Sequence, residues 1–161
     1  MQTKKANKKQ AIVIYFARKP LFEDIAKNQA CQNNADIYEI KPTVNLMGIS
    51  GIFTAWQYYR EKKLVPIENP AIDLDGYQDY YFICPLTFDR INLPTLSLLV
   101  YLKPKLKNVH YVIVGNDKNF DRVNVDILND AAQITEPKSI TYIKCNKTYK
   151  KIKEEIKIKE A

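Results

Sequence analysis

Apolar runs bounded by turn residues alternate along this sequence with segments of helical periodicity. The first run, from Ala11 to Phe16, has no polar interruption, as expected for a strand that helices cover on both faces. A strand, a helix and a second parallel strand make a βαβ unit, and connections of this kind are right-handed. The alternation therefore predicts an α/β fold in which a doubly wound parallel sheet lies between two helical layers, a three-layer sandwich.

The same pattern predicts five strands, at residues 11–16, 36–41, 79–84, 109–115 and 139–144. Helices are expected at 21–33, 52–62 and 93–102, and an apolar stripe from Phe120 to Ala131 indicates another. A closing helix should follow, with Tyr149, Ile152 and Ile156 facing inward. For a chain of this length, five strands favour the order 2-1-3-4-5, with a ligand beyond the carboxyl ends of strands one and three.

With 161 residues, the chain fits one domain, which we expect at residues 11–161. Residues 1–10 are rich in lysine, have no apolar pattern and are expected to form a basic flexible arm. No apolar run approaches the roughly 18 to 20 residues of a membrane span, and no secretory signal follows the lysines. We therefore expect a cytoplasmic protein without membrane contact. The three cysteines lack disulfide or zinc spacing, so we expect free thiols and no metal site.

The formal net charge is +7. Much of it lies in the amino-terminal arm and in residues 147–159, where lysines alternate with glutamates in the expected closing helix. A solvated helix face and a basic tail explain this distribution, and a patch that follows phosphates is the alternative. No nucleic-acid motif is present, so we expect no specific nucleic-acid partner.

Several segments resemble the short-chain bacterial flavodoxins. Residues 15–18 read Tyr-Phe-Ala-Arg, which is similar to the family's Tyr-Phe-Ser-Arg, and residues 35–42 are very similar to the family's second strand. Tyr77, Phe82, Pro85 and Pro94 match the family around its third strand. The resemblance covers about residues 11 to 115 and implies the flavodoxin-like fold, with FMN as the only candidate cofactor and electron transfer as the family's activity.

In that family, the turn after strand one reads Ser/Thr-x-Thr-Gly-x-Thr and wraps the FMN phosphate. A dianion needs several convergent donors, and glycine lets the backbone close on it. The matching residues here are 17–22, in which all three hydroxyl side chains are missing and Pro20 replaces the glycine. Arg18 and Lys19 can neutralise a phosphate from the side, or they can be an ordinary solvent-facing pair before the helix.

The family's second flavin contact, Pro-x-Trp-Trp-Gly, corresponds to residues 85–89, which read Pro-Leu-Thr-Phe-Asp. Phe88 is the one residue there that can stack on a flavin, although it can equally cover the end of the sheet. Asp89 puts a carboxylate where the family offers a backbone N–H to the flavin. The third loop begins at Gly115 and Asn116 and retains one glycine. The candidate cofactor-binding residues are therefore Ala17, Arg18, Lys19, Phe22, Pro85, Thr87, Phe88, Asp89, Arg90 and Asn116.

Catalytic residues are not expected. His110 is the only histidine and opens a predicted strand far from these loops, so we interpret it as a structural or surface residue and do not expect a Ser/His/Asp apparatus. The leading hypothesis is a non-redox binding or interaction module with a degenerate FMN site and no tightly bound cofactor. The alternative is an FMN-dependent electron-transfer protein or oxidoreductase in which Arg18 and Lys19 replace the hydroxyls. Expected partners are a small anionic or phosphorylated ligand, or a protein, including a second copy that binds the helix around Trp56, Tyr58 and Tyr59.

Overall fold

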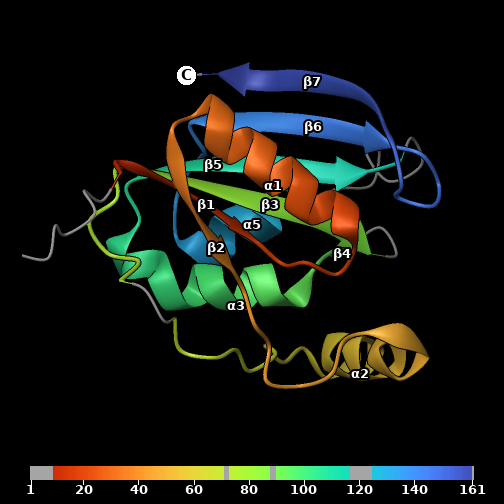
Figure 1. The fold of residues 1–161 in the computed structure, drawn as a ribbon. Helices are drawn as coiled ribbons and strands as arrows, with labels where there is room; N and C mark the ends of the chain where they lie inside the picture. The colour runs from red at the N-terminus through yellow and green to blue at the C-terminus, as the bar shows by residue number, and fades with distance from the viewer. Residues whose placement is uncertain (1–8, 71–72, 88–89, 117–124, 161) are drawn as a thin grey trace, which may run out of the picture.

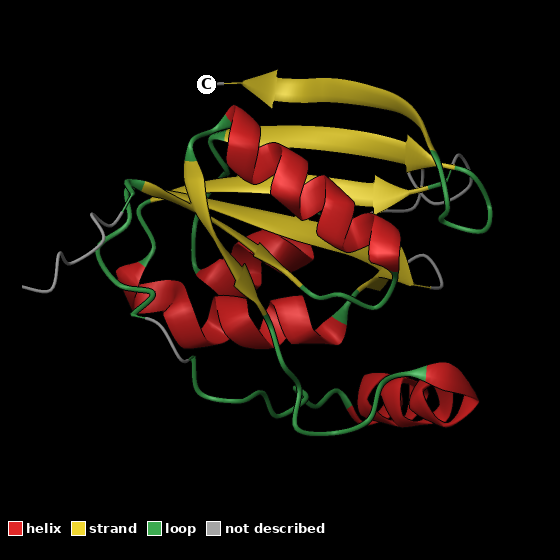
Figure 2. Cartoon of the chain, in the orientation of Figure 1, coloured by secondary structure: helices red, strands yellow, loops and turns green. Residues whose placement is uncertain are grey.

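The computed structural model describes residues 9–70, 73–87, 90–116 and 125–160, which form one sheet with helices on both faces (Figures 1 and 2). The strands are β1 (Ala11–Tyr15), β2 (Ala35–Glu39), β3 (Asp79–Thr87), β4 (Arg90–Ile91), β5 (Asn108–Gly115), β6 (Ser139–Cys145) and β7 (Ile152–Glu160). The helices are α1 (Pro20–Gln32), α2 (Gly48–Glu61), α3 (Leu93–Leu102) and α5 (Asp126–Ala132), with a 3-10 turn η1 (Lys103–Lys105).

The sheet has the order β2-β1-β3-β5-β6-β7, and the short β4 pairs with the end of β3. The first five strands along this path are parallel, which confirms the predicted order of the parallel part. The expectation of a sheet with only five strands is wrong, because β7 adds an antiparallel edge strand beside β6. Residues 1–8 of the expected amino-terminal arm and part of the stripe from Phe120 lie outside the described residues. The last two residues of the expected arm contact the folded domain, because the backbone N–H of Lys9 donates to Asp36 Oδ2 at 3.3 Å and the carbonyl of Gln10 accepts from Gln78 at 2.7 Å.

The predicted closing helix is wrong, because residues 152–160 form β7. Ile152 and Ile156 are four residues apart, a spacing that suits a helix face, but it also suits one face of a strand. Pairing with β6 decides between the two, and Tyr142 lies opposite Ile156. A tight turn starts the strand: Asn146 Oδ1 accepts hydrogen bonds from the backbone N–H groups of Lys150 (2.8 Å) and Lys151 (3.2 Å).

Two apolar cores lie on opposite faces of the sheet. The first contains Ile12, Phe82 and Tyr111 and packs against α3 and α5. The second contains Val13 and Ile83 and packs against α1. This division follows from the alternation of side chains along each strand. In the described part of the chain, α1 is the helix that covers the second face, so β6 and β7 extend beyond it (Figure 1).

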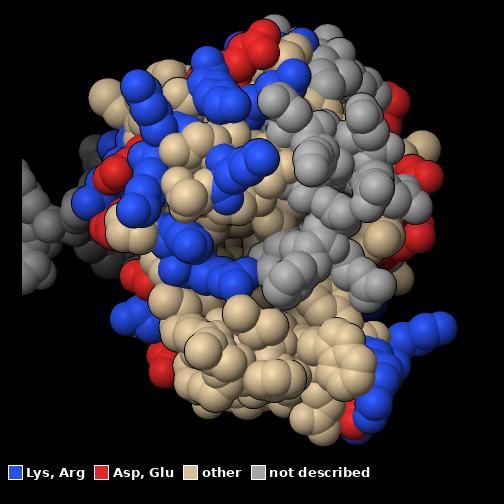
Figure 3. Space-filling view, turned by 90° about the vertical axis from the view of Figure 1, so that its right-hand side faces the viewer, with Lys and Arg blue, Asp and Glu red and all other residues tan. Residues whose placement is uncertain are grey.

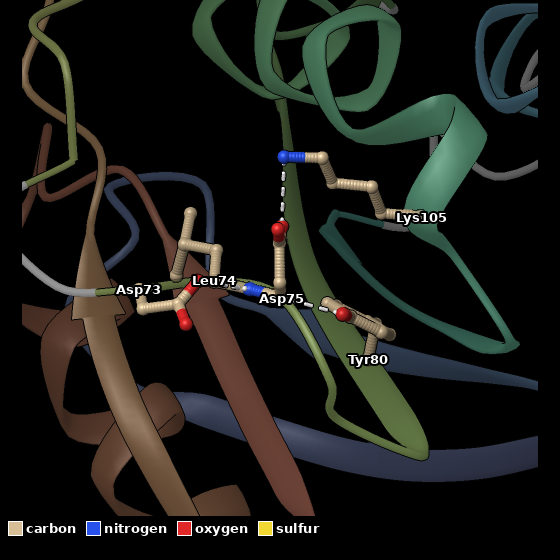
Figure 4. Close-up of polar contacts among 5 residues, drawn as sticks. All are labelled: Asp73, Leu74, Asp75, Tyr80 and Lys105. Atoms are coloured by element: carbon tan, nitrogen blue, oxygen red, sulfur yellow. Dashed lines mark hydrogen bonds and ion pairs between the residues drawn. The ribbon is translucent and has the colours of Figure 1, made fainter.

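The turn before β3 is held by a set of polar contacts (Figure 4). Asp73 Oδ1 accepts from the backbone N–H of Asp75 at 2.9 Å, and Gly76 has a positive φ of 78°. The Tyr80 hydroxyl donates to the carbonyl of Leu74 at 2.8 Å. Lys105 Nζ lies 2.9 Å from Asp75 Oδ1 and ties this turn to η1. These contacts fix the amino end of the central strand.

Candidate functional site

The candidate site lies where the winding of the sheet reverses, between β1 and β3. These strands are parallel neighbours, with Ile14 opposite Phe82, so the segments that follow them leave the sheet at the same end. Figure 3 looks onto this end and shows Lys and Arg side chains gathered on its upper part. The surface below them is largely uncharged.

The segment between β1 and α1 closes on itself. The backbone N–H of Arg18 donates to the carbonyl of Phe16 at 3.0 Å, and that of Phe22 donates to Lys19 at 3.0 Å. Pro20 occupies the first position of α1, and Lys19 makes no side-chain capping bond. A phosphate at a helix N-terminus is held by N–H groups that point at it. Two of those groups already have partners here, and Pro20 has none to offer.

Tyr149 lies beside the same segment. It follows β6 in the turn that leads to β7, has a φ of 54°, and its hydroxyl donates to the carbonyl of Leu86 at 3.2 Å. Its ring packs edge-on against Phe22, with the centroids 5.7 Å apart. Tyr149 therefore bridges the first turn of α1 and the end of β3. The sequence predicted that Tyr149 faces inward but placed it on a helix, so this bridge was missed.

A small apolar hollow lies at the same end of the sheet but on its other face, between the end of β1, the start of α3 and α2. Its walls include Phe16, Arg18, Ile52 and Asn92, and its volume is about 30 Å³. That space suits one or two water molecules and not a three-ring flavin. Asn92 is occupied elsewhere, because its Oδ1 accepts from the N–H of Thr95 at 3.0 Å and its Nδ2 donates to Pro85 O at 3.4 Å.

The predicted site residues fall into three groups. Ala17, Arg18, Lys19 and Phe22 lie on the segment between β1 and α1 and on its first helical turn. Pro85 is buried within β3 and lies opposite Val114 of β5, whereas Thr87 and Arg90 pair across the β3–β4 hairpin. Phe88 and Asp89 lie outside the described residues, and Asn116 directly follows β5. The structure thus brings the described members of all three groups to the carboxyl ends of β1, β3 and β5, at one end of the sheet.

A second polar cluster lies at the opposite end. His110 Nε2 is 2.8 Å from Asp79 Oδ1, and His110 Nδ1 is 2.7 Å from Ser139 Oγ. Sequence reasoning was right that His110 lies far from the loops but wrong that no Ser/His/Asp arrangement would form. A signal was present, because all three residues stand within the first three positions of neighbouring parallel strands.

Comparison with known proteins identifies the fold. No protein-family model matches the chain. No curated protein matches it either. A flavoprotein from Lactobacillus acidophilus, solved in complex with FMN, is similar with a TM-score of 0.63 and 16% identity, over 77% of this chain and 86% of that one. A putative flavoprotein from Bacteroides uniformis gives 0.67 and 13%, over 89% and 96%. The chain has the flavodoxin-like fold of these proteins.

An apo form of a Lactobacillus acidophilus flavoprotein extends the likeness, with a TM-score of 0.66 and 16% identity over 88% of this chain and 96% of that one. At such identities the likeness concerns the flavodoxin-like fold and not the site. Among the described residues, no helix has the length and apolar character needed to cross a membrane.

Proposed function

We propose that this flavodoxin-like protein is a binding or interaction module that does not hold FMN as a tight redox cofactor. The closed segment between β1 and α1 carries the proposal, since the N–H groups of Arg18 and Phe22 are bonded to carbonyls of the same segment. The bridge from Tyr149 to Leu86 and Phe22 adds to it, because an isoalloxazine ring placed between the first turn of α1 and the end of β3 would have to displace it.

Titration with FMN tests this proposal. Flavodoxin-type binding would quench flavin fluorescence and shift its absorption. We expect neither change with FMN at tens of micromolar, because each missing charge-assisted hydrogen bond removes about 1.5 to 3 kcal/mol. A preparation that is yellow, or a saturable quench at that concentration, would refute the proposal. A Tyr149→Ala variant titrated in parallel shows whether the bridge itself excludes the ring.

A working FMN site is the second candidate. The observation that favours it is the shared fold with a flavoprotein solved in complex with FMN. In that case Arg18 and Lys19 would supply the charge that the missing hydroxyls do not, and reduction by dithionite would bleach a bound flavin. The same titration separates the two candidates.

A loosely held anion is the ligand class that suits the first proposal. Arg18 lines the apolar hollow and Lys19 is exposed at the start of α1, so both can approach a phosphate from the side. Calorimetry with inorganic phosphate and with FMN should show weak, salt-sensitive heats that the Arg18→Ala, Lys19→Ala double variant abolishes. Lys27→Ala, an exposed lysine later on α1, is the matched control.

A further inference from the structure

A polar cavity of about 140 Å³ opens on the α1 face of the sheet, at the amino ends of β5 and β6. The last turn of α1, the two strands and β7 form its walls. β7 runs antiparallel to β6 at the edge of the sheet (Figure 1) and contributes Lys157 to the wall. The lining includes Gln29, Asn33, Lys138, Ser139, Thr141 and Lys157.

His110 and Ser139 both line this cavity and belong to a continuous hydrogen-bonded chain with Asp79. A carboxylate only accepts hydrogen bonds, so Asp79 requires the proton of the neutral imidazole on Nε2. His110 Nδ1 is then the acceptor, and the Ser139 hydroxyl donates to it at 2.7 Å. The order is carboxylate, imidazole, hydroxyl, in which each group orients the next.

The imidazole is also held in its plane. The Tyr81 ring stacks on His110 with a centroid distance of 4.2 Å and an interplanar angle of 8°. Tyr81, His110 and Ser139 stand opposite one another in register on three neighbouring strands, so rigid parallel backbone positions all three side chains. A nucleophile with a base in hydrogen-bond reach and a third group that orients the base is the signature of nucleophilic catalysis.

We propose that this cavity is an acyl-transfer site that hydrolyses small carboxylic esters, with Ser139 as nucleophile, His110 as general base and Asp79 as positioning residue. The cavity volume of about 140 Å³ restricts the acyl group to a few heavy atoms. Lys138, Glu155 and Lys157 line the same cavity, and the two lysines are the cationic groups from which an oxyanion could be stabilised. This inference concerns the end of the sheet opposite the flavin-type site and does not rest on the proposed function.

The reaction is balanced without a cofactor. Ser139 Oγ forms a bond to the ester carbonyl carbon while its proton passes to His110 Nδ1. The carbon–oxygen bond to the alcohol then breaks, and His110 returns the proton to the departing alkoxide. Water repeats the sequence on the acyl-serine, releases the acid and restores the Ser139 hydroxyl.

The test uses the full chain with 4-nitrophenyl acetate as substrate and a fluorophosphonate as label. We expect saturable release of nitrophenolate and labelling at Ser139, located by peptide mass spectrometry. Ser139→Ala and His110→Gln should each lower the rate by about 10²–10⁴-fold, the usual contribution of general base catalysis. Ser50→Ala, the same substitution at an exposed serine of α2 that does not line the cavity, should keep the activity.

Asp79→Asn separates catalysis from structure. An asparagine amide can donate to Nε2 and so favours the tautomer in which Nδ1 carries the proton and no longer accepts from Ser139. We expect a lower kcat with an unchanged KM and a circular dichroism spectrum like that of the parent. The proposal is overturned if Ser139 is not labelled, or if Ser139→Ala and the parent hydrolyse the ester at the same rate.

Discussion

Gly51 sits where α2 comes closest to the chain that precedes it. A Cβ added at Gly51 would overlap the backbone carbonyl carbon of Leu46. The neighbouring helix residue Ile49 is 78% exposed and meets no such limit. The absence of a side chain at Gly51 therefore sets how closely α2 approaches its own entry segment.

Gly51→Ala should destabilise the protein, although the same change in an exposed helix stabilises by about 1 kcal/mol. The overlap with backbone atoms should outweigh that gain and cost about 1–3 kcal/mol. Urea unfolding followed by the fluorescence of Trp56 on α2 measures the effect. Ile49→Ala serves as control, with a change within about 0.5 kcal/mol. A more stable Gly51→Ala would show that α2 can move away from Leu46 without loss.

Asn92 joins the start of α3 to the end of β3. It is 5% exposed, and its Oδ1 accepts from both the N–H and the hydroxyl of Thr95, at 3.0 and 2.7 Å. Asn92→Ala should cost about 1–2 kcal/mol, the usual effect of losing a helix cap. Asn92→Ser keeps a capping oxygen and should cost less. Equal midpoints in urea for the two variants would mean that the cap does not contribute.

At the scale of elements, α2 has the most exposed large apolar side chains of the helices that the structure describes. Ile49, Phe53 and Trp56 are 78%, 68% and 57% exposed, and their spacing of four and three residues places them on one face. Arg60 lies 4.8 Å over the Trp56 ring. Exposed apolar patches of this kind mark interaction sites. The sequence expected Trp56, Tyr58 and Tyr59 together on the exposed side, but both tyrosines pack partly against the core.

A second copy of the chain is the partner that we expect on this face. The side chains of Ile49, Phe53 and Trp56 are apolar, so the same face of a second copy can bury them, with Arg60 as the charged group beside Trp56. Sedimentation velocity over a concentration series should show a dimer that Phe53→Ser with Trp56→Ser dissociates. Tyr101→Ser is the control, because Tyr101 is 51% exposed on α3. A parent protein that stays monomeric throughout would contradict this prediction.

The parallel part of the sheet could be predicted from sequence because β1, β3 and β5 contain apolar runs typical of strands covered on both faces, and because β2 and β6 alternate apolar and polar residues as strands do. The location of the candidate site followed from the same order. The β7 strand could not be predicted, since its lysines, glutamates and two isoleucines four apart satisfy a helix as well as a strand. Tyr149 was consequently assigned to the wrong element. Only tertiary pairing with β6 resolves that ambiguity.

For the whole molecule, buried ionisable groups set the response to alkaline pH. Burial raises the pKa of the Cys145 thiol to about 11 and raises the pKa of Cys84 further. Desolvation likewise raises the pKa of Tyr111. All three groups are neutral when protonated, so the folded state keeps protons that the unfolded chain releases at lower pH.

The contribution of these three groups to stability should therefore be constant below about pH 8, where even unfolded thiols are protonated, and stability should fall as the pH rises from about 9 towards 11. Between its pKa in the unfolded chain and its pKa in the folded protein, each group lowers the free energy of unfolding by up to about 1.4 kcal/mol per pH unit. Urea midpoints measured between pH 7 and pH 10.5 test this slope, and Cys145→Ala should make it shallower. If the urea midpoint of that variant falls with pH as steeply as that of the parent protein, Cys145 does not contribute.

β7 runs from the end of the sheet that holds Tyr149 to the end that holds the polar cavity. β7 begins after the turn that holds Tyr149 at one end of the sheet, and its Lys157 reaches the cavity at the other. Beyond that, β7 covers β6, whose residues Ser139–Cys145 contain a single charge and favour intermolecular pairing when their edge is open. Its own outer edge is dense in lysine and glutamate, side chains that oppose such pairing. β7 thus replaces the weakly charged edge of β6 with a charged edge, an exchange that should oppose aggregation through strand pairing.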